Sequence, residues 1–86
     1  MKVRIGSPLR SYTGNASTVA AAGATVAALI EDLDRQFPGL AFRIVDEQGR
    51  LRPHMVVWLG QERCRDLTAS LDGLAEVVIM QALSGG

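Results

Sequence analysis

The sequence predicts a small α+β domain in which a mixed β-sheet packs against one main helix. Three observations lead to this prediction. The stretch 25–37 carries apolar residues at helical spacing, residues 2–5 alternate between polar and apolar, and compact apolar runs occur at 55–59 and 76–83. A single amphipathic helix needs one sheet face to cover its apolar stripe, so the chain should fold into two layers.

The first two expected elements form a hairpin. Residues 2–5 place Val3 and Ile5 on one face and charged residues on the other, as in a half-buried strand. The Gly-Ser-Pro sequence at 6–8 interrupts or frays this strand. Residues 17–22 then form a second strand that pairs with the first.

The main helix is the clearest element of the sequence. Thr25 is a suitable N-cap, because its hydroxyl group can accept a hydrogen bond from a free amide of the first turn. The Pro-Gly pair at 38–39 ends the helix. One apolar stripe follows from the helical period, and it consists of Val26, Leu29, Ile30, Leu33 and Phe37.

The second half of the chain supplies the remaining strands. The run 55–59 is expected to be a central strand, and 76–83 is expected to be the last strand. Between the helix and the end of the chain, we also expect a short strand or irregular segment at 40–45, a returning strand at 62–67 and one helical turn at 68–71.

This order of elements matches the β-grasp, or ubiquitin-like, roll. The hairpin comes first, so the last strand has a natural place beside strand 2–5 in the interior of the sheet. We expect one domain over residues 1–83, followed by a flexible glycine tail at 84–86.

Composition excludes several classes of function. Nine basic and nine acidic residues cancel, which leaves no electrostatic footprint for nucleic acid and no polybasic signal for a membrane. The single cysteine, Cys64, excludes an internal disulfide and fits a reducing compartment. Neither a signal peptide nor a membrane span is evident, so a soluble cytoplasmic protein is expected.

The last residues suggest where the function lies. Gly85 and Gly86 have no Cβ, so they form a backbone slim enough to thread a narrow channel in another protein. Three extended residues reach roughly 10 Å at about 3.3–3.6 Å each. The terminal carboxylate of Gly86 is therefore a candidate working group. Without other features, a frayed chain end or a cloning remnant would be the favoured explanation of the two glycines.

Three stretches resemble the ubiquitin-like sulfur carriers of the molybdopterin-synthase small-subunit and thiamine-biosynthesis type. They are the helix with its stop at 25–40, the last strand with its tip at 77–86, and the segment 9–14. The segment 9–14 is similar to one in the longer carriers linked to cysteine biosynthesis. Gln81 and Ala82 stand where molybdopterin carriers usually have two prolines. The pathway stays open among cysteine, thiamine, molybdopterin and a secondary metabolite.

The resemblance implies a mechanism centred on Gly86. An E1-like adenylating enzyme would use ATP and magnesium to adenylate the Gly86 carboxylate. Sulfur from a sulfurtransferase or a sulfide source would then displace AMP and leave a thiocarboxylate, which a sulfur-accepting synthase would use. The chain would be a cosubstrate and not an enzyme. It would bind no cofactor itself.

Partner binding is expected at the last strand and the tail. If Val77 and Ile79 face the helix, Val78 and Met80 face outward, where uncovered apolar groups often mark interaction sites. The resemblance implies that Met80 contacts the activating enzyme. Tail contacts inside the partner's channel are expected from Leu83, Ser84 and Gly85.

Two other functions share the same fold and tip. The activated Gly86 could be joined to a lysine of a target protein, as ubiquitin is, or the chain could be a plain interaction domain with an inert tip. Cys64 and His54 lack the company of other metal ligands, because a zinc site needs about four such groups. We expect packing roles for Cys64, Trp58 and Tyr12, and a surface position for His54.

Overall fold

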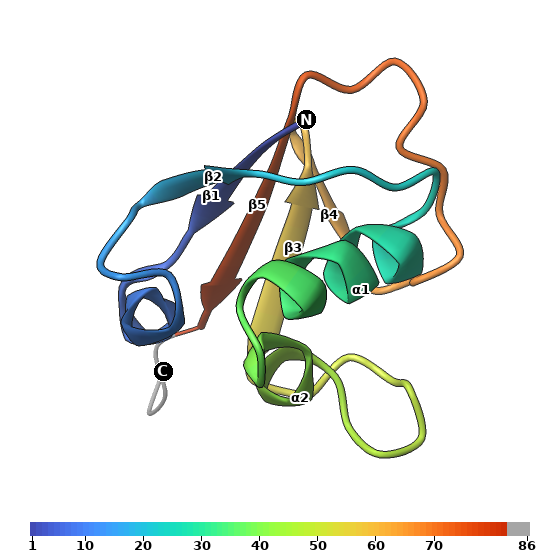
Figure 1. Cartoon of the computed structure of the whole chain (residues 1–86). Coiled ribbons are helices and arrows are strands. Elements are labelled where there is room, and N and C mark those ends of the chain that lie inside the picture. The colour runs from blue at the N-terminus through green and yellow to red at the C-terminus, as the bar shows by residue number, and fades with distance from the viewer. Residues whose placement is uncertain (83–86) are drawn as a thin grey trace.

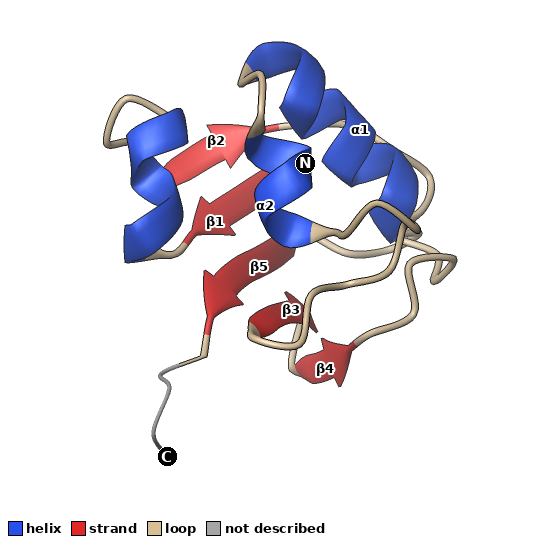
Figure 2. Cartoon of the chain, turned by 90° about the horizontal axis from the view of Figure 1, so that it is seen from below, coloured by secondary structure: helices blue, strands red, loops and turns tan. Residues whose placement is uncertain are grey.

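The computed structural model describes residues 1–82 of the chain. A sheet of five strands, in the order β2-β1-β5-β3-β4, carries α1 and α2 on one face (Figures 1 and 2). The elements in chain order are β1 (Lys2–Ile5), η1 (Ser7–Tyr12), β2 (Thr18–Ala20), α1 (Val26–Gln36), α2 (Leu40–Ile44), β3 (Met55–Leu59), β4 (Glu62–Cys64) and β5 (Glu76–Gln81). The predicted α+β class and β-grasp topology are confirmed.

The last strand lies in the middle of the sheet, as predicted. β5 runs parallel to β1, with Val3 opposite Val77 and Ile5 opposite Ile79, and it runs antiparallel to β3 on its other side. The two hairpins, β1–β2 and β3–β4, flank this central strand. Because β5 is hydrogen-bonded on both edges, it holds the end of the described chain in a fixed position.

The core lies between the sheet and the two helices. The predicted helix is confirmed: the Thr25 hydroxyl accepts a hydrogen bond from the Ala28 amide at 3.2 Å, and the helix begins at Val26. The apolar stripe faces the sheet, although Phe37 at its end is only half-buried. The buried residues of α1 are Val26, Leu29, Ile30 and Leu33.

Residues 40–44 form α2, so the expected short strand or irregular segment at 40–45 is wrong. Gly39 adopts the left-handed conformation, with φ at 95°, and turns the chain sharply after α1. The Asp34 carboxylate then accepts hydrogen bonds from the amides of Gly39 and Ala41, each at 3.1 Å. Within α2, Leu40 and Ile44 are both buried. Phe42 between them is exposed, which fits a helix and not a strand, because positions 40, 42 and 44 of a strand would share one face.

The predicted helical turn at 68–71 is also wrong. This segment lies against the first turn of α1, and its backbone forms hydrogen bonds with the residues at the start of that helix. The Val26 amide donates to the Ala69 carbonyl group at 3.1 Å, and the Leu71 amide donates to the Ala24 carbonyl group at 2.9 Å. A helix has unsatisfied amides at its first turn, and an extended neighbour supplies the acceptors that they need.

The segment 6–12 contains a helix that the sequence analysis did not predict. After Gly6, the chain forms η1, a 3-10 helix with proline in its first turn and with Leu9 buried beneath it. This helix contacts both β5 and α2. Strands β2 and β4 exist as predicted but are shorter than the expected ranges 17–22 and 62–67.

Candidate functional site

The end of the sheet from which the C-terminal segment leaves is the centre of the candidate site. β5 ends at Gln81, and the Ala82 amide donates to the His54 carbonyl group at 2.8 Å. In Figures 1 and 2 this end of β5 lies at the same end of the fold as η1 and α2. The predicted site residues Leu83, Ser84, Gly85 and Gly86 lie outside the described residues, as does the predicted boundary between domain and tail.

The side chains of β5 alternate between the two faces of the sheet as predicted. Val77 and Ile79 are 0% exposed in the core, whereas Met80 is 37% exposed and Val78 is half-buried on the other face. No helix of residues 1–82 covers that face (Figure 2). The orientation of Val78 and Met80 is therefore confirmed, and their role in partner binding stays a prediction.

Two further apolar residues join Val78 and Met80 on the open face. Trp58 lies opposite Val78, and Val56 lies opposite Met80, in the register of β3 with β5. Side chains of residues paired across two strands lie on the same face. These four residues form the open-face patch: Val56, Trp58, Val78 and Met80. Val56 is 6% exposed, so it supports the patch from below and contributes little accessible surface.

Sequence reasoning missed Trp58 and Val56 because the run 55–59 is apolar throughout. A continuous apolar run hides which residues face the core. No alternation within 55–59 sets the parity of β3, which becomes visible only from the burial of Met55 and Val57 in the structure.

Charged side chains flank the open-face patch on both sides. Arg4 lies opposite Val78 in the register of β1 with β5, and Arg63 lies opposite Trp58 in the register of β3 with β4. Glu76 forms ion pairs with Lys2 at 3.5 Å and with Arg4 at 3.6 Å. These pairs are exposed and contribute little to stability. The open face therefore combines an apolar centre with charged neighbours.

A hollow surrounds the root of the tail, between η1 and the end of β5. Its volume is about 700 Å³, and it is lined by Gly6, Ser7, Pro8, His54, Met80, Gln81 and Ala82. Gly6 sets its inner wall, because the Gly6 amide donates to the Ile79 carbonyl group at 2.8 Å. A Cβ atom at Gly6 would lie 2.9 Å from the Met80 Cα atom, so only glycine permits this close approach.

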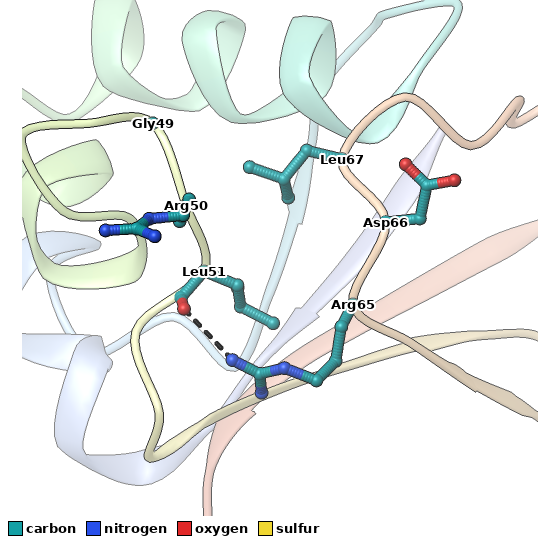
Figure 3. A pocket seen from close by; sticks show the side chains of 6 residues that line it. All are labelled: Gly49, Arg50, Leu51, Arg65, Asp66 and Leu67. Atoms are coloured by element: carbon teal, nitrogen blue, oxygen red, sulfur yellow. Dashed lines mark hydrogen bonds between the residues drawn. The ribbon is translucent and has the colours of Figure 1, made fainter.

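A second hollow, between the loop before β3 and the segment after β4, is structural. Figure 3 shows Arg65 reaching across it to the Leu51 carbonyl oxygen, at 3.0 Å. The same guanidinium donates to the carbonyl groups of Met55 and Arg52. An arginine with three backbone acceptors ties the two loops together. It therefore has few donors left for a ligand.

Residues 1–82 contain no group of three or more His, Cys, Asp or Glu side chains that could hold a metal ion. His54 is exposed, and Cys64 is half-buried with its thiol 3.4 Å from the Asp66 carbonyl oxygen. Over the same residues, no helix has the length and apolar character needed to cross a membrane.

The carboxyl groups with perturbed pKa values serve the fold. A hydrogen bond from the Ala22 amide lowers the pKa of Asp32, one from the Arg50 amide lowers the pKa of Asp46, and bonds from Thr68 lower that of Asp66. Asp32 lies on α1 and binds the connection that precedes this helix, whereas Asp46 and Asp66 each bind amides of their own turns. The described residues therefore offer an open apolar face, and the chain is held to the sheet as far as Ala82. They show no cluster of catalytic groups.

The fold defines a class: a ubiquitin-like β-grasp protein whose last strand lies in the middle of the sheet. The chain belongs to the ThiS family, whose family model matches residues 3–86. The predicted membership in the ubiquitin-like sulfur carrier family is thus confirmed.

Individual relatives agree with this assignment. The chain is 33% identical to the sulfur carrier protein CysO of Mycobacterium tuberculosis and of Mycobacterium bovis, over the full length of this chain and of each relative. The crystal structure of M. tuberculosis CysO superposes with a TM-score of 0.88 at 29% identity, covering 95% of this chain and 98% of that one.

A second solved structure is a complex. The BexX/CysO complex of Amycolatopsis orientalis contains a chain that superposes with a TM-score of 0.88 at 34% identity, covering 99% of this chain and 98% of that one. The small archaeal modifier protein SAMP1 of Haloferax volcanii, at 24% identity and a TM-score of 0.80, shares the fold.

Proposed function

We propose that this protein is a sulfur carrier that bears its sulfur as a thiocarboxylate on Gly86. The observation that carries the proposal is the full-length similarity to CysO sulfur carriers, together with a family match that extends through Gly86. The geometry supports it, because β5 directs the chain outward at an end of the sheet that has an apolar surface beside it.

The chemistry begins with activation, because a carboxylate has no good leaving group. An adenylating partner joins the Gly86 carboxylate to the α-phosphorus of magnesium-bound ATP, and pyrophosphate leaves. Sulfide then attacks the acyl carbon, so that a C–S bond forms and the C–O bond to AMP breaks. ATP, magnesium and the catalytic groups belong to the partner. The carrier contributes its carboxylate and a surface for docking, and it is not itself an enzyme.

Three partners follow from this scheme. They are an E1-like adenylating enzyme, a sulfurtransferase or other sulfide source, and a synthase that accepts the sulfur. The open-face patch is the proposed contact for the adenylating enzyme, since Met80 adapts its shape to different surfaces. The BexX/CysO complex supports binding of a relative to another protein. The similarity to CysO carriers supports the branch linked to cysteine biosynthesis. The proposed location is the cytoplasm.

The intact mass of the protein, purified from its native host, tests the proposal. A population heavier by the exchange of one oxygen for one sulfur is expected, and it should disappear when the adenylating enzyme is deleted. As a control, Gly86→Ala should fold normally yet be activated poorly, because the added Cβ atom obstructs a narrow channel. Isopeptide-linked ladders on other proteins, without the sulfur-bearing species, would instead establish a protein modifier. Full function after deletion of Gly85 and Gly86 would establish a plain interaction domain.

A further inference from the structure

A basic and aromatic surface lies next to the root of the tail and is separate from the open-face patch. It consists of Phe42 and Arg43 on α2 with Arg52 and His54 from the segment before β3, and these four residues line one hollow of about 270 Å³. We call it the basic-aromatic patch. His54 also lines the hollow around the tail root, so the two surfaces are continuous.

The aromatic ring at the centre of this patch is held outward. Phe42 is 61% exposed, the most exposed large apolar side chain among the described residues. Arg52 lies over the ring, 4.8 Å from its centroid, and its Nε atom donates to the Phe42 carbonyl group at 2.8 Å. The cation and the hydrogen bond fix the ring in place, so a partner would meet a preformed surface.

The cations of the patch are not neutralised within residues 1–82. No acidic residue lines either hollow, and neither Arg43 nor Arg52 takes part in an ion pair among the described residues. The pKa of Asp46 is lowered mainly by the Arg50 amide and least by the charge of Arg52, and the Asp46 carboxylate is already bonded to the amides of Gln48 and Arg50. The chain as a whole is neutral. The patch therefore places two positive charges, without acidic partners among residues 1–82, near the end of the last strand.

We propose that the basic-aromatic patch docks an acidic segment of the adenylating enzyme, with an apolar side chain of that segment against Phe42. This inference rests on the proposed function. Charge complementarity at the edge of an interface speeds encounter and fixes orientation. A patch adjoining the root of the tail is well placed for both. Nucleic acid is a poorer fit, because two arginines on a neutral chain fall short of the many phosphate contacts that affinity requires.

The test is ATP–pyrophosphate exchange by the adenylating enzyme of the same organism, with the full-length carrier as substrate. Arg43→Glu should raise the KM for the carrier about tenfold at roughly 50 mM salt and about threefold or less at roughly 500 mM, because salt screens exposed charges. The kcat at saturating carrier should change little. Phe42→Ser should raise the KM at both salt concentrations, since its contact is apolar.

The matched control is Arg35→Glu, which reverses the charge of another exposed arginine, on α1. Its KM should stay within about twofold of the wild-type value if the effect belongs to the patch. Circular dichroism and thermal unfolding verify that each variant is folded. Restoration of the Arg43→Glu defect by an acid-to-lysine change in the enzyme would identify the docked segment.

Two outcomes would overturn the proposal, and they are distinguishable. Equal KM values for Arg43→Glu, Arg35→Glu and wild type would refute the docking surface. The carrier function would be unaffected by that result, because the wild-type protein would still support exchange. Absence of exchange with the wild-type protein would refute the carrier function, and the docking proposal with it.

Discussion

The two faces of β5 differ in what covers them, although their side chains alternate along a single strand. On one face, Val77 and Ile79 lie under the helices and are fully buried. On the other face, Val78 and Met80 lie on an apolar surface that no helix of residues 1–82 covers. Burial of Val77 and Ile79 favours folding. We assign the uncovered apolar groups to binding.

The comparison shows how a small carrier can combine rigidity with a free surface. Because β5 is hydrogen-bonded to β1 and β3, its open face keeps its shape without a covering layer. Docking there need not order the strand first, which lowers the entropic cost of association. The variants below separate the two faces.

The largest effect on stability is expected from Ile79→Ala on the covered face. The substitution leaves a cavity in a packed core, so the free energy of unfolding should fall by about 3 kcal/mol. Urea unfolding followed by circular dichroism measures this change. A loss smaller than about 1 kcal/mol would mean that the covered face contributes little to the fold.

Met80→Glu on the open face should weaken partner binding with little loss of stability, the reverse of what is expected for the core substitution Ile79→Ala. We expect the free energy of unfolding to change by no more than about 0.5 kcal/mol, because the side chain is exposed. The KM for the carrier in the adenylation reaction should rise about tenfold, which corresponds to about 1.4 kcal/mol.

The matched control for Met80→Glu is Thr18→Glu, an exposed position on the edge strand β2. It should leave both the free energy of unfolding and the KM nearly unchanged. If Met80→Glu unfolds the domain, Met80 belongs to the core and the division between the faces is wrong.

The smallest effect on stability is expected from Asp32→Asn. Asp32 lies on α1 and therefore on neither face of β5. The Asp32 carboxylate accepts hydrogen bonds from the Ala22 amide at 3.0 Å and from Arg35 at 3.0 Å, and these lower its pKa from 3.8. A lowered folded-state pKa contributes stability above the unfolded-state pKa, and this contribution is lost as the pH falls from 3.8 through the folded-state value. Asn removes this contribution.

Urea midpoints at pH 7 and at a pH below 3.8 measure the Asp32 effect. The midpoint of Asp32→Asn should lie below the wild-type midpoint at pH 7, and the two should converge in acid. A difference that is the same at both pH values would contradict the assigned ionic role.

Much of the fold could be predicted from period and capping. The α1 stripe, the Thr25 cap and the strands β1, β3 and β5 depend on local patterns that the sequence displays. The central place of β5 followed from the order of the elements. The outward orientation of Val78 and Met80 followed from the two-residue period of a strand.

The elements that could not be predicted depend on contacts distant in sequence. The segment 67–71 is held by backbone hydrogen bonds with residues 24–27, about forty positions earlier, and no local pattern records that contact. α2 depends on the Asp34 carboxylate and on the burial of Leu40 and Ile44. The basic-aromatic patch also joins two separate segments, so its residues come together only in the folded chain.

The hydrogen bond from Ala82 to His54 has a consequence for partner architecture. It fixes the backbone one residue beyond β5, so Ala82 is the last described point at which the chain is held to the sheet. Fully extended, four residues span at most about 14 Å. Under the proposed activation of Gly86, an adenylating enzyme that contacts the domain at this end of the sheet would have to hold the α-phosphorus of its nucleotide within about that distance of Ala82. The anchor point at Ala82 would then relate the contact surface of the carrier to the depth of the partner's active site.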